Sequence, residues 1–597
     1  MDLNRHHWFA TLGFAYWYSS DSRYLRAFIA ESADWMDQYL TRLGRIRWDT
    51  PFQVASRVNA WIWAHYLFLP STDWDAVHYT RFVRGLGLLT EYLDQTIEYH
   101  SPGNHILLEA KTLLLCGEAF PEFGGASRWR RRGWRILGAE LQKQICQDGV
   151  HAERSTMYHR IVAGELAELW LFLRLRKDLR ASVLEGVVRK MANFQRWIDQ
   201  GGGQLPLFGD AYAEDTYYRF SAPALVAGND RGAAQHLITE STDHTYWLLG
   251  GECKTPERPP DQVAAAASEA FHEGGYFVTR SPSAPFADVL VWDCGPVGFY
   301  RNRKHAHLDS LAFTLSIAGT PLLIDPGTSM AVELKETLRG TRAHSTLCID
   351  GEEQGILAAR GEIWSPPRPE LVLWATSLEC TIMSGRHDGY RRLREPVWHA
   401  RTIVTMHGLY WLIVDCIEGS GVHLAEQRFH VAPGAAAALG ADGHSIELSK
   451  GAARLSLKWA QDRILGRSPG KTPFLRVERS EAELRCGSPE QTQIVKANRG
   501  GSVPFALTVV ASVRPDVLVS YAGAADDVIT VTGPNFKHDV YLSSGSALTT
   551  PAGWDTDAPV VIVRSSGREK PQDMLLAGPS RLSRAGREYP LRAAENG

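Results

Sequence analysis

The apolar positions in the first part of the chain, from residue 5 to about residue 240, recur at the spacing of amphipathic helices. The pattern is clear in Leu86–Leu93, in Ile106–Leu115 and around Trp170. Proline, glycine and serine interrupt it at intervals that allow helices of roughly 12 to 22 residues. Antiparallel helical hairpins packed in a ring or a solenoid use helices of this length. We therefore predict an all-α domain for residues 1–250.

The period of the pattern changes after residues 251–270, which contain a proline-rich and then an alanine-rich run. We interpret this stretch as a linker between domains. Beyond it, short runs rich in β-branched residues, such as Ala287–Trp292 and Phe505–Val513, are separated by turn residues. This spacing predicts a β-sandwich of many antiparallel strands over residues 271–597.

Composition narrows the class of protein. Of the 597 residues, 44% are hydrophobic and 22% charged, which is typical of a globular chain and excludes a disordered or fibrous one. The net charge of −3 lacks the basic excess of a nucleic-acid-binding protein. The eight cysteines never form a CxxC pair, which argues against a zinc ribbon.

The cellular location follows less directly from the sequence. No stretch approaches the length of an apolar membrane span, and the first residues lack the pattern of an export signal. For the chain as written we expect a cytoplasmic protein that binds no membrane, and a periplasmic or secreted one if a signal has been removed. The sequence leaves the oligomeric state open.

The densest polar cluster runs from Tyr300 to Asp309, directly before a predicted strand. If His305 and His307 are extended, their side chains project to the same face. A hairpin that turns near Gly319 places Asp325 opposite about residue 312, so His307 reaches it only if the preceding segment folds back. His344 precedes another strand. His307, Asp325 and His344 then fit a zinc site. The alternative is a surface histidine pair, a turn-starting aspartate and a hydrogen-bonded edge histidine.

Two helix starts in the first domain also carry candidate chemistry. Asn104 precedes an apolar run and is well placed as a helix N-cap. If Ser155 caps a later helix, Tyr158 lies in its first turn, where the helix dipole favours a phenolate. The alternative for Tyr158 is a half-buried side chain with a satisfied hydroxyl group. The basic run Arg301, Arg303 and Lys304 is either a solvated loop or an anion-binding one.

In their order and spacing, these segments resemble the heparinase II/III family of polysaccharide lyases. The segments that carry the resemblance are Asn104-His105, Asp148-Gly149 through Tyr158-His159, Phe208-Gly209-Asp210, His305-Ala306-His307-Leu308-Asp309, Asp325-Pro326-Gly327-Thr328, Ala343-His344-Ser345-Thr346 and His387-Asp388-Gly389-Tyr390. The resemblance implies an N-terminal incomplete α/α toroid followed by a C-terminal antiparallel β-sandwich. This architecture agrees with the change of period described above.

The resemblance also implies an activity. Such lyases cleave uronate-containing polysaccharides, of glycosaminoglycan or alginate type, by β-elimination, which leaves a 4,5-unsaturated uronate at the new non-reducing end. By resemblance, Asn104 and His105 bind the uronate carboxylate. Tyr158 is the general acid, and also the base where the proton and the leaving group lie on the same side. His305 is the base for the opposite epimer.

The remaining expectations concern a metal and substrate contacts. The resemblance assigns His307, Asp325 and His344 to a mainly structural zinc ion that braces the loop carrying His305. Arg154 and Arg303 are candidate contacts to an acidic polysaccharide or oligosaccharide.

Two other classes of protein remain open at this point. One is a glycoside hydrolase that uses Glu153 and Asp210 on a helical toroid. The other is a glycan-binding protein without turnover, since Ser329-Met330 stand where family members often carry tyrosine.

Overall fold

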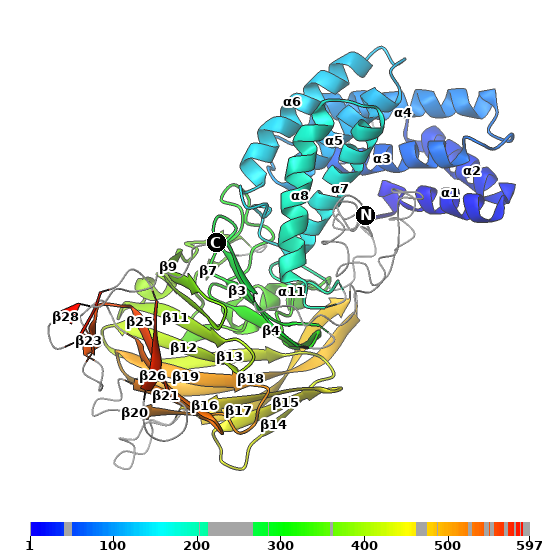
Figure 1. Ribbon diagram of the computed structural model, residues 1–597. Coiled ribbons are helices and arrows are strands. Elements are labelled where there is room, and N and C mark those ends of the chain that lie inside the picture. Colours follow the sequence, from blue (N-terminus) through cyan, green and yellow to red (C-terminus); the bar gives the residue numbers. More distant parts are fainter. Residues whose placement is uncertain are drawn as a thin grey trace.

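Helices and sheets occupy separate parts of the molecule (Figure 1). The structure is a computed structural model of the 597-residue chain. It describes residues 2–40, 50–201, 203–212, 267–283, 286–358, 362–460, 474–485, 488–522, 528–542, 548–549, 554–565, 571–577, 581–584 and 587–588.

Eight α-helices fill the described residues up to 212, as the periodicity predicts. They are α1 (Trp8–Ser19), α2 (Ser22–Tyr39), α3 (Pro51–Phe68), α4 (Ala76–Thr96), α5 (Asn104–Ala119), α6 (Ala126–Gln144), α7 (Thr156–Leu175) and α8 (Arg180–Ile198). Their lengths of 12 to 21 residues match the expected range. None of the described helices is both long and apolar enough to cross a membrane.

Side chains at the helix starts explain several of these boundaries. Asp21 and Asp75 each accept a hydrogen bond from a backbone N–H in the first turn of the helix that follows. Thr50 and Gln53 form a reciprocal capping box around the start of α3. Ser155 caps α7 by accepting a hydrogen bond from the Tyr158 backbone N–H, as predicted.

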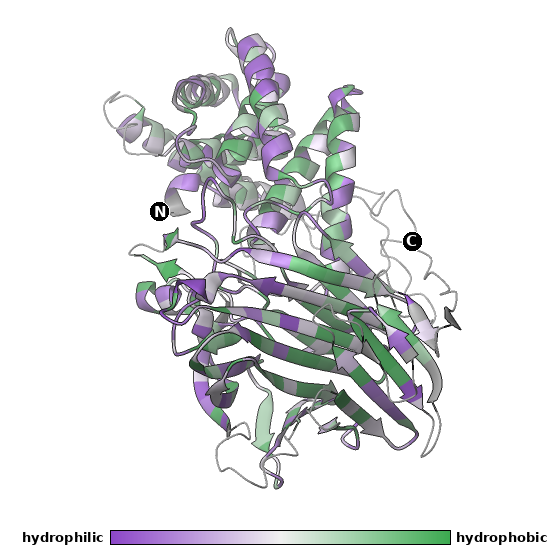
Figure 2. Cartoon of the chain, turned by 90° about the vertical axis from the view of Figure 1, so that its left-hand side faces the viewer, coloured by the Kyte–Doolittle hydropathy of each residue, from purple (hydrophilic) through white to green (hydrophobic). Residues whose placement is uncertain are grey.

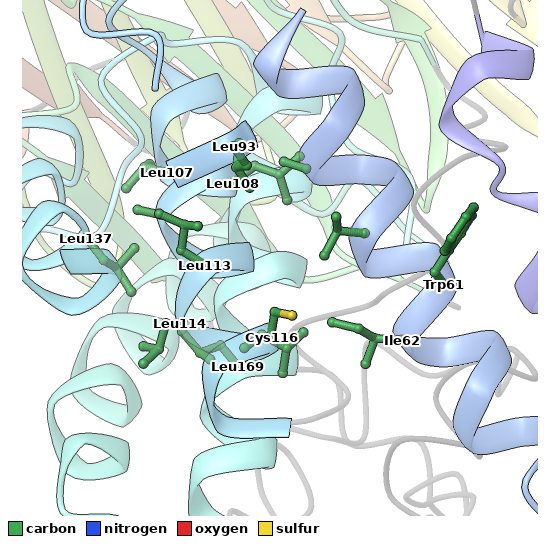
Figure 3. Close-up of a cluster of buried hydrophobic side chains, with 14 of the residues drawn as sticks. Trp61, Ile62, Leu93, Leu107, Leu108, Leu113, Leu114, Cys116, Leu137 and Leu169 are labelled. Atoms are coloured by element: carbon green, nitrogen blue, oxygen red, sulfur yellow. The ribbon is translucent and has the colours of Figure 1, made fainter. Parts of the chain in front are cut away.

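The core of the helical domain is built around α5, which is buried on all sides. Leu113 and Leu114 of this helix lie among Ile62 of α3, Leu137 of α6 and Leu169 of α7 (Figure 3). A helix that is hydrophobic around its whole circumference is stable only when neighbours cover every face. The polar residues at the start of α5 are therefore held by a rigid element.

Two large antiparallel sheets form the predicted sandwich. The first contains, in spatial order, β1 (Ala267–Phe271), β2 (Tyr276–Ser281), β3 (Asp288–Asp293), β4 (Phe313–Ile317), β5 (Thr320–Leu323), β13 (Val422–Val431), β18 (Ser488–Ser502) and β17 (Phe474–Arg485), with β6 (Leu347–Ile349) paired to β13. The second contains β14 (Ala436–Leu439), β15 (Ser445–Lys450), β16 (Ala453–Trp459), β19 (Phe505–Ser512), β12 (Tyr410–Gly419), β11 (Val397–Met406), β10 (Cys380–His387) and β9 (Pro369–Thr376). Figure 2 shows that long stretches of these strands are hydrophobic, drawn in green.

The boundary of the sandwich differs slightly from the prediction. Because β1 begins at Ala267, the last four residues of the expected linker 251–270 belong to a strand. Residues 251–266 lie outside the described part of the chain. The predicted hairpin at Gly319 is present, since Ile317 of β4 pairs with Thr320 of β5.

A third layer, which the sequence did not predict, covers the outer face of the second sheet. It is a five-stranded sheet made of β20 (Leu518–Ala522), β21 (Val528–Gly533), β22 (Phe536–Leu542), β25 (Val560–Ser565) and β26 (Pro571–Ala577). Leu412 and Val414 of β12 share an apolar cluster with Val531 and Ile562 of this sheet. The central strand β12 is therefore buried on both faces over most of its length, whereas the edge strands β9 and β14 remain largely exposed. Two smaller sheets pair β7 (Ile356–Leu357) with β8 (Ile363–Trp364), and join β23 (Leu548–Thr549), β24 (Trp554–Thr556), β27 (Leu582–Arg584) and β28 (Arg587–Glu588).

An apolar cluster joins the helical domain to the first sheet. Phe194 of α8 and Phe208 pack with Tyr276 of β2 and with Val289 and Val291 of β3. In Figure 1 the end of α8 reaches this sheet. The contact fixes the segment after α8 against the sandwich, and that segment supplies part of the candidate site.

Candidate active site

Asn104 is the first residue of α5, and its side chain is hydrogen-bonded to the buried carboxylate of Glu153. The N-cap is Gly103 and not Asn104, so the predicted capping role is wrong. The backbone N–H of Asn104 donates to Oε1 of Glu153 at 2.8 Å, and Nδ2 lies 3.0 Å from Oε2. Gly103 has φ = 148°, and a Cβ there would lie 2.3 Å from Oε1 of Glu153. Glycine is therefore required for this close approach.

His105, the next residue, is fixed by a second buried carboxylate. Its Nδ1 lies 2.8 Å from Oε2 of Glu98, and its ring stacks on Phe52 at 4.0 Å between centroids. Burial tends to raise the pKa of Glu98, but the hydrogen bond with His105 lowers it below its usual value. The side chain of His105 remains 37% exposed, so the imidazole can meet a ligand.

A third carboxyl group lies behind this pair. Oε2 of Glu109 accepts a hydrogen bond from the Glu98 backbone N–H at 2.9 Å. Burial raises the pKa of Glu109 to about 9. Glu109 is therefore a neutral acid at pH 7, next to the ionised Glu98.

Tyr158 of α7 and His305 of the sandwich stack against each other, with ring centroids 3.7 Å apart and an interplanar angle of 27°. Ser155 joins the start of α7 to the segment of Asp210, since its Oγ accepts from the Tyr158 N–H and donates to the Asp210 carbonyl oxygen at 2.6 Å. The stack brings the two predicted proton-transfer residues together from different domains.

The carboxylate of Asp210 organises the side of the site that the sandwich contributes. Asp210 is 1% exposed and follows α8 in the chain. Five side chains from the sandwich bind its two oxygens: His305 at 3.0 Å, His307 at 3.1 Å, Thr328 at 2.9 Å, Arg339 at 2.9 Å and Lys335 at 3.1 Å. His305 and His307 thus face one carboxylate, although they lie in a loop and not in the extended strand considered from the sequence.

These contacts determine the protonation state of Asp210 and the tautomer of His305. Burial tends to raise the pKa of Asp210, but hydrogen bonds from His305 and His307 hold it well below its usual value. An ionised carboxylate accepts a hydrogen bond from Nδ1–H of His305. Nε2 of a neutral His305 then carries the lone pair that a general base needs.

His307, Asp325 and His344 converge as predicted from the sequence. Their ligand atoms lie within 4.8 Å of one another, and all three residues are buried. Oδ2 of Asp325 lies 2.7 Å from Nδ1 of His344. Among the described residues, Nδ1 of His307 and Nε2 of His344 have no hydrogen-bond partner. Buried ring nitrogens rarely stay unpaired, and two histidines with one aspartate fit a divalent metal such as zinc.

Arg154 is held by backbone carbonyl groups on both sides of the domain boundary. Its guanidinium donates to the carbonyls of Gly274 at 3.1 Å, Glu273 at 2.9 Å, Gly298 at 3.0 Å and Ala152 at 2.9 Å. This geometry favours a structural role for Arg154 over the substrate contact expected from the sequence.

Arg303, the other predicted contact, lies at the edge of a solvent-filled cavity. Its Nε donates to the Val297 carbonyl at 3.3 Å, and the side chain lines a cavity of about 730 Å³ on the sandwich.

Two family descriptions match this chain over most of its length. Heparinase II/III N-terminus matches residues 1–223, and Heparinase II/III-like, C-terminal matches residues 264–514. The chain belongs to the heparinase II/III family. The boundary between the two matches agrees with the change from helices to strands.

Curated members of this family include a heparin-sulfate lyase of Pedobacter heparinus, which is 26% identical over 445 residues, 70% of this chain and 61% of the relative. A heparin-sulfate lyase of Bacteroides stercoris is 24% identical over 453 residues, 70% of this chain and 62% of the relative. The chain thus spans about three fifths of the length of these relatives.

Solved structures of the same family show the fold. A heparan sulfate lyase of Pedobacter heparinus superposes with a TM-score of 0.66 at 18% identity, covering 97% of this chain and 82% of that chain. A heparinase III structure gives a TM-score of 0.67 at 16% identity, covering 96% and 82%. The predicted incomplete α/α toroid followed by an antiparallel β-sandwich is confirmed.

Asp210 is the main residue of the site for which the sequence predicted no role in a lyase; it was named only as a carboxylate of the hydrolase alternative. The signal was the segment Phe208-Gly209-Asp210, which carried part of the family resemblance without a role. Gly209 has φ = 66°, and a Cβ there would lie 2.7 Å from the His305 carbonyl oxygen. The backbone N–H of Asp210 also donates to that oxygen at 3.0 Å. The glycine allows the two segments to approach.

Proposed function

We propose that this protein is a polysaccharide lyase that cleaves a uronate-containing acidic glycan by β-elimination. The main support is the stack of Tyr158 on His305, with Nδ1 of His305 held by an ionised Asp210. The names of the curated heparin-sulfate lyases favour a sulfated glycosaminoglycan as the substrate class.

The reaction first requires neutralisation of the uronate carboxylate, because the C5 proton is only weakly acidic. Asn104 and His105 are the first two residues of the 16-residue helix α5. Backbone N–H groups and the helix dipole favour negative charge at this end. The carboxylate of the sugar binds here, and His105 stabilises the charge that develops on it after C5 loses its proton.

Proton transfer follows at the stacked pair. The base takes the C5 proton, the C4–O4 bond breaks, and the electron pair of the C5–H bond forms the C4=C5 double bond. Tyr158 donates its phenolic proton to O4. When the proton and O4 lie on opposite faces of the ring, Nε2 of His305 is the base and the Tyr158 phenol is the acid. When they lie on one face, Tyr158 reacts as the phenolate, which takes the C5 proton and passes the same proton to O4.

The hydrolase alternative has less support. Hydrolysis by paired carboxyl groups needs both of them to reach the glycosidic bond or an attacking water. Glu153 and Asp210 are each only 1% exposed, and protein groups bind both oxygens of each carboxylate. Binding without cleavage remains the alternative that activity measurements must test.

Replacement of Tyr158 tests the lyase directly. The wild-type protein is incubated with heparan sulfate, chondroitin sulfate and alginate, and unsaturated products are detected by absorbance at ~230 nm and by mass. We expect Tyr158→Phe to lower kcat at least ~1000-fold with an unchanged Tm, because it removes only the phenolic hydroxyl group and keeps the ring. Saturated products from the wild type would favour a hydrolase, and binding without products would favour a glycan-binding protein. Full activity of Tyr158→Phe would remove this residue from the mechanism.

We further propose that His307, Asp325 and His344 hold a structural zinc ion. When bound, the ion would join the loops on either side of His305 and so restrict their motion. The expected result is about one zinc per chain in purified protein and much less in His344→Ala, with a lower Tm for that variant. His65, which is also buried but lies on α3 in the helical domain, provides the matched control His65→Ala. Equal zinc in the wild type and His344→Ala would contradict the site.

A further inference from the structure

The cavity beside Arg303 carries a concentration of positive charge that the catalytic residues do not use. Its volume is about 730 Å³, and three segments line it: 296–303, 365–369 and 388–392. Four arginines contribute to the lining, namely Arg303, Arg368, Arg391 and Arg392. Among the described residues of the lining, Asp388 is the one carboxylate, and its Oδ1 already accepts a hydrogen bond from the Arg368 backbone N–H. The cavity is therefore strongly electropositive.

The arginines differ in how many hydrogen bonds and ion pairs their guanidinium groups form with the rest of the protein. Arg392 donates to backbone carbonyls of Gly389 and Glu353 and has a structural role. Arg368 and Arg391 are exposed, and within the described part of the chain neither forms an ion pair. One face of the Arg391 guanidinium lies over the ring of Trp398, 5.4 Å from its centroid. Their guanidinium groups are therefore accessible to a ligand.

Guanidinium groups bind carboxylates and sulfates through paired N–H donors in one plane. The volume of the cavity lies in the range of sites that hold a small molecule or one part of a polymer. Tyr300, which is 71% exposed, adds an aromatic side chain with an apolar face and a polar tip to the rim. These features suit an anionic sugar better than a bare inorganic ion.

The cavity shares one loop with the candidate active site. Residues 296–303 line the cavity and lead directly to His305. In the same loop, Nδ2 of Asn302 donates to the Pro102 carbonyl at 2.9 Å, two residues before Asn104. A chain bound near Asn104 and His305 therefore lies close to the wall of the cavity.

We propose that this cavity is a second anion-binding subsite, which takes a sulfate or carboxylate group of the acidic glycan at a sugar away from the cleaved bond. The proposal rests on the proposed function for the identity of its ligand. The subsite contributes binding energy and leaves the proton transfers to Tyr158 and His305.

The double variant Arg368→Gln/Arg391→Gln tests the subsite, because both side chains are exposed and their loss leaves the core intact. With heparan sulfate as substrate we expect KM to rise at least ~10-fold with kcat within about twofold, since these residues act in binding alone. Added salt should weaken the variant less than the wild type, because fewer charges remain to be screened. Arg454→Gln is the matched control, since Arg454 lies on β16 and bonds only to nearby backbone carbonyls.

A second substrate identifies the bound group. The same polymer after chemical desulfation and N-acetylation keeps its uronates but loses its sulfates. If a sulfate occupies the cavity, the double variant and the wild type differ only with the sulfated polymer. If a carboxylate occupies it, the difference persists with both. An unchanged KM with both polymers overturns the subsite.

Direct binding separates this proposal from the proposed function. The affinity for heparan sulfate oligosaccharides is measured by calorimetry in Tyr158→Phe, with and without the two arginine substitutions. Weaker binding after the arginine substitutions supports the subsite even if the wild-type protein cleaves no polymer, a result that would contradict the lyase alone. Equal binding with an active wild type contradicts the subsite alone, and equal binding with an inactive wild type contradicts both.

Discussion

The two sides of the candidate site hold their polar side chains in different ways. On the helical side, each residue has its own buried carboxylate: Glu153 holds Asn104, and Glu98 holds His105. On the sandwich side, the single carboxylate of Asp210 binds five side chains, including both histidines of the His305 loop.

This difference predicts how many residues of the site a single substitution should disturb. A rigid helix already positions Asn104 and His105, so each carboxylate has only to orient one side chain. Of the five residues that bind Asp210, Lys335 lies in the short helix α11 (Val332–Leu338) and the other four lie outside helices and strands. A shared ionic centre holds these four in place of regular backbone structure. Loss of one carboxylate on the helical side should therefore disturb a single residue of the site, whereas loss of the Asp210 carboxylate should disturb all five of its partners together.

The largest effect is expected from Asp210→Asn. The substitution keeps the size of the side chain but leaves Arg339 and His307 buried without their counter-charge. We expect a loss of about 3–5 kcal/mol in the free energy of unfolding. Activity should fall at least ~100-fold because His305 loses the partner that sets its tautomer. Urea denaturation and product absorbance measure the two effects, and wild-type stability in the variant would contradict the shared centre.

A smaller and more local effect is expected from Glu153→Gln. The amide of the new side chain places an NH2 group, which can only donate, where one of the two carboxylate oxygens accepted a hydrogen bond from Asn104. We expect a loss of about 1–3 kcal/mol in stability. Asn104 should also be misoriented, which lowers kcat more than it raises KM. Asn104→Ala should add little further loss of activity in this background, whereas additive losses would show that the two residues act independently.

The smallest effect at neutral pH is expected from Glu109→Gln, which tests the carboxyl group behind Glu98. The folded-state pKa of Glu109, about 9, lies above its ordinary value of 4.5. The folded protein therefore keeps a proton that the unfolded chain releases, and stability decreases as pH rises from about 4.5 to about 9, by at most about 1.4 kcal/mol per pH unit. Glu109→Gln cannot release this proton, so the decrease should become shallower. Unfolding free energies at pH 5, 7 and 9 measure the slope, and identical slopes would contradict the assignment.

Most of the fold could be predicted from the sequence, because the spacing of apolar residues along the chain indicates which segments form helices and which form strands. The helical spacing predicted α5 and α7, and the β-branched runs predicted β3, β12 and β19. The third sheet was not predicted, because alternation along a strand does not tell which other sheet covers its second face. The cap of α5 was also assigned wrongly: Asn104 has the right side chain for an N-cap, but Glu153 competes for its hydrogen bonds.

The site was partly predictable for a similar reason. Tyr158, His305 and the set of His307, Asp325 and His344 lie in short, distinctive segments, and the structure brings the expected partners together. The roles of Asp210 and Arg154 depend on contacts that span about a hundred residues, such as 95 between Asp210 and His305. A single sequence carries no signal for such pairs unless a motif happens to mark them.

The four carbonyl groups around Arg154 have a consequence for how the molecule moves. Three of them, from Glu273, Gly274 and Gly298, belong to the sandwich, and the fourth belongs to the helical domain. The domains can separate at this point only by breaking several charge-assisted hydrogen bonds together. Any change in the space between the domains that keeps these hydrogen bonds intact is therefore smallest at Arg154 and larger at parts of the interface farther from it.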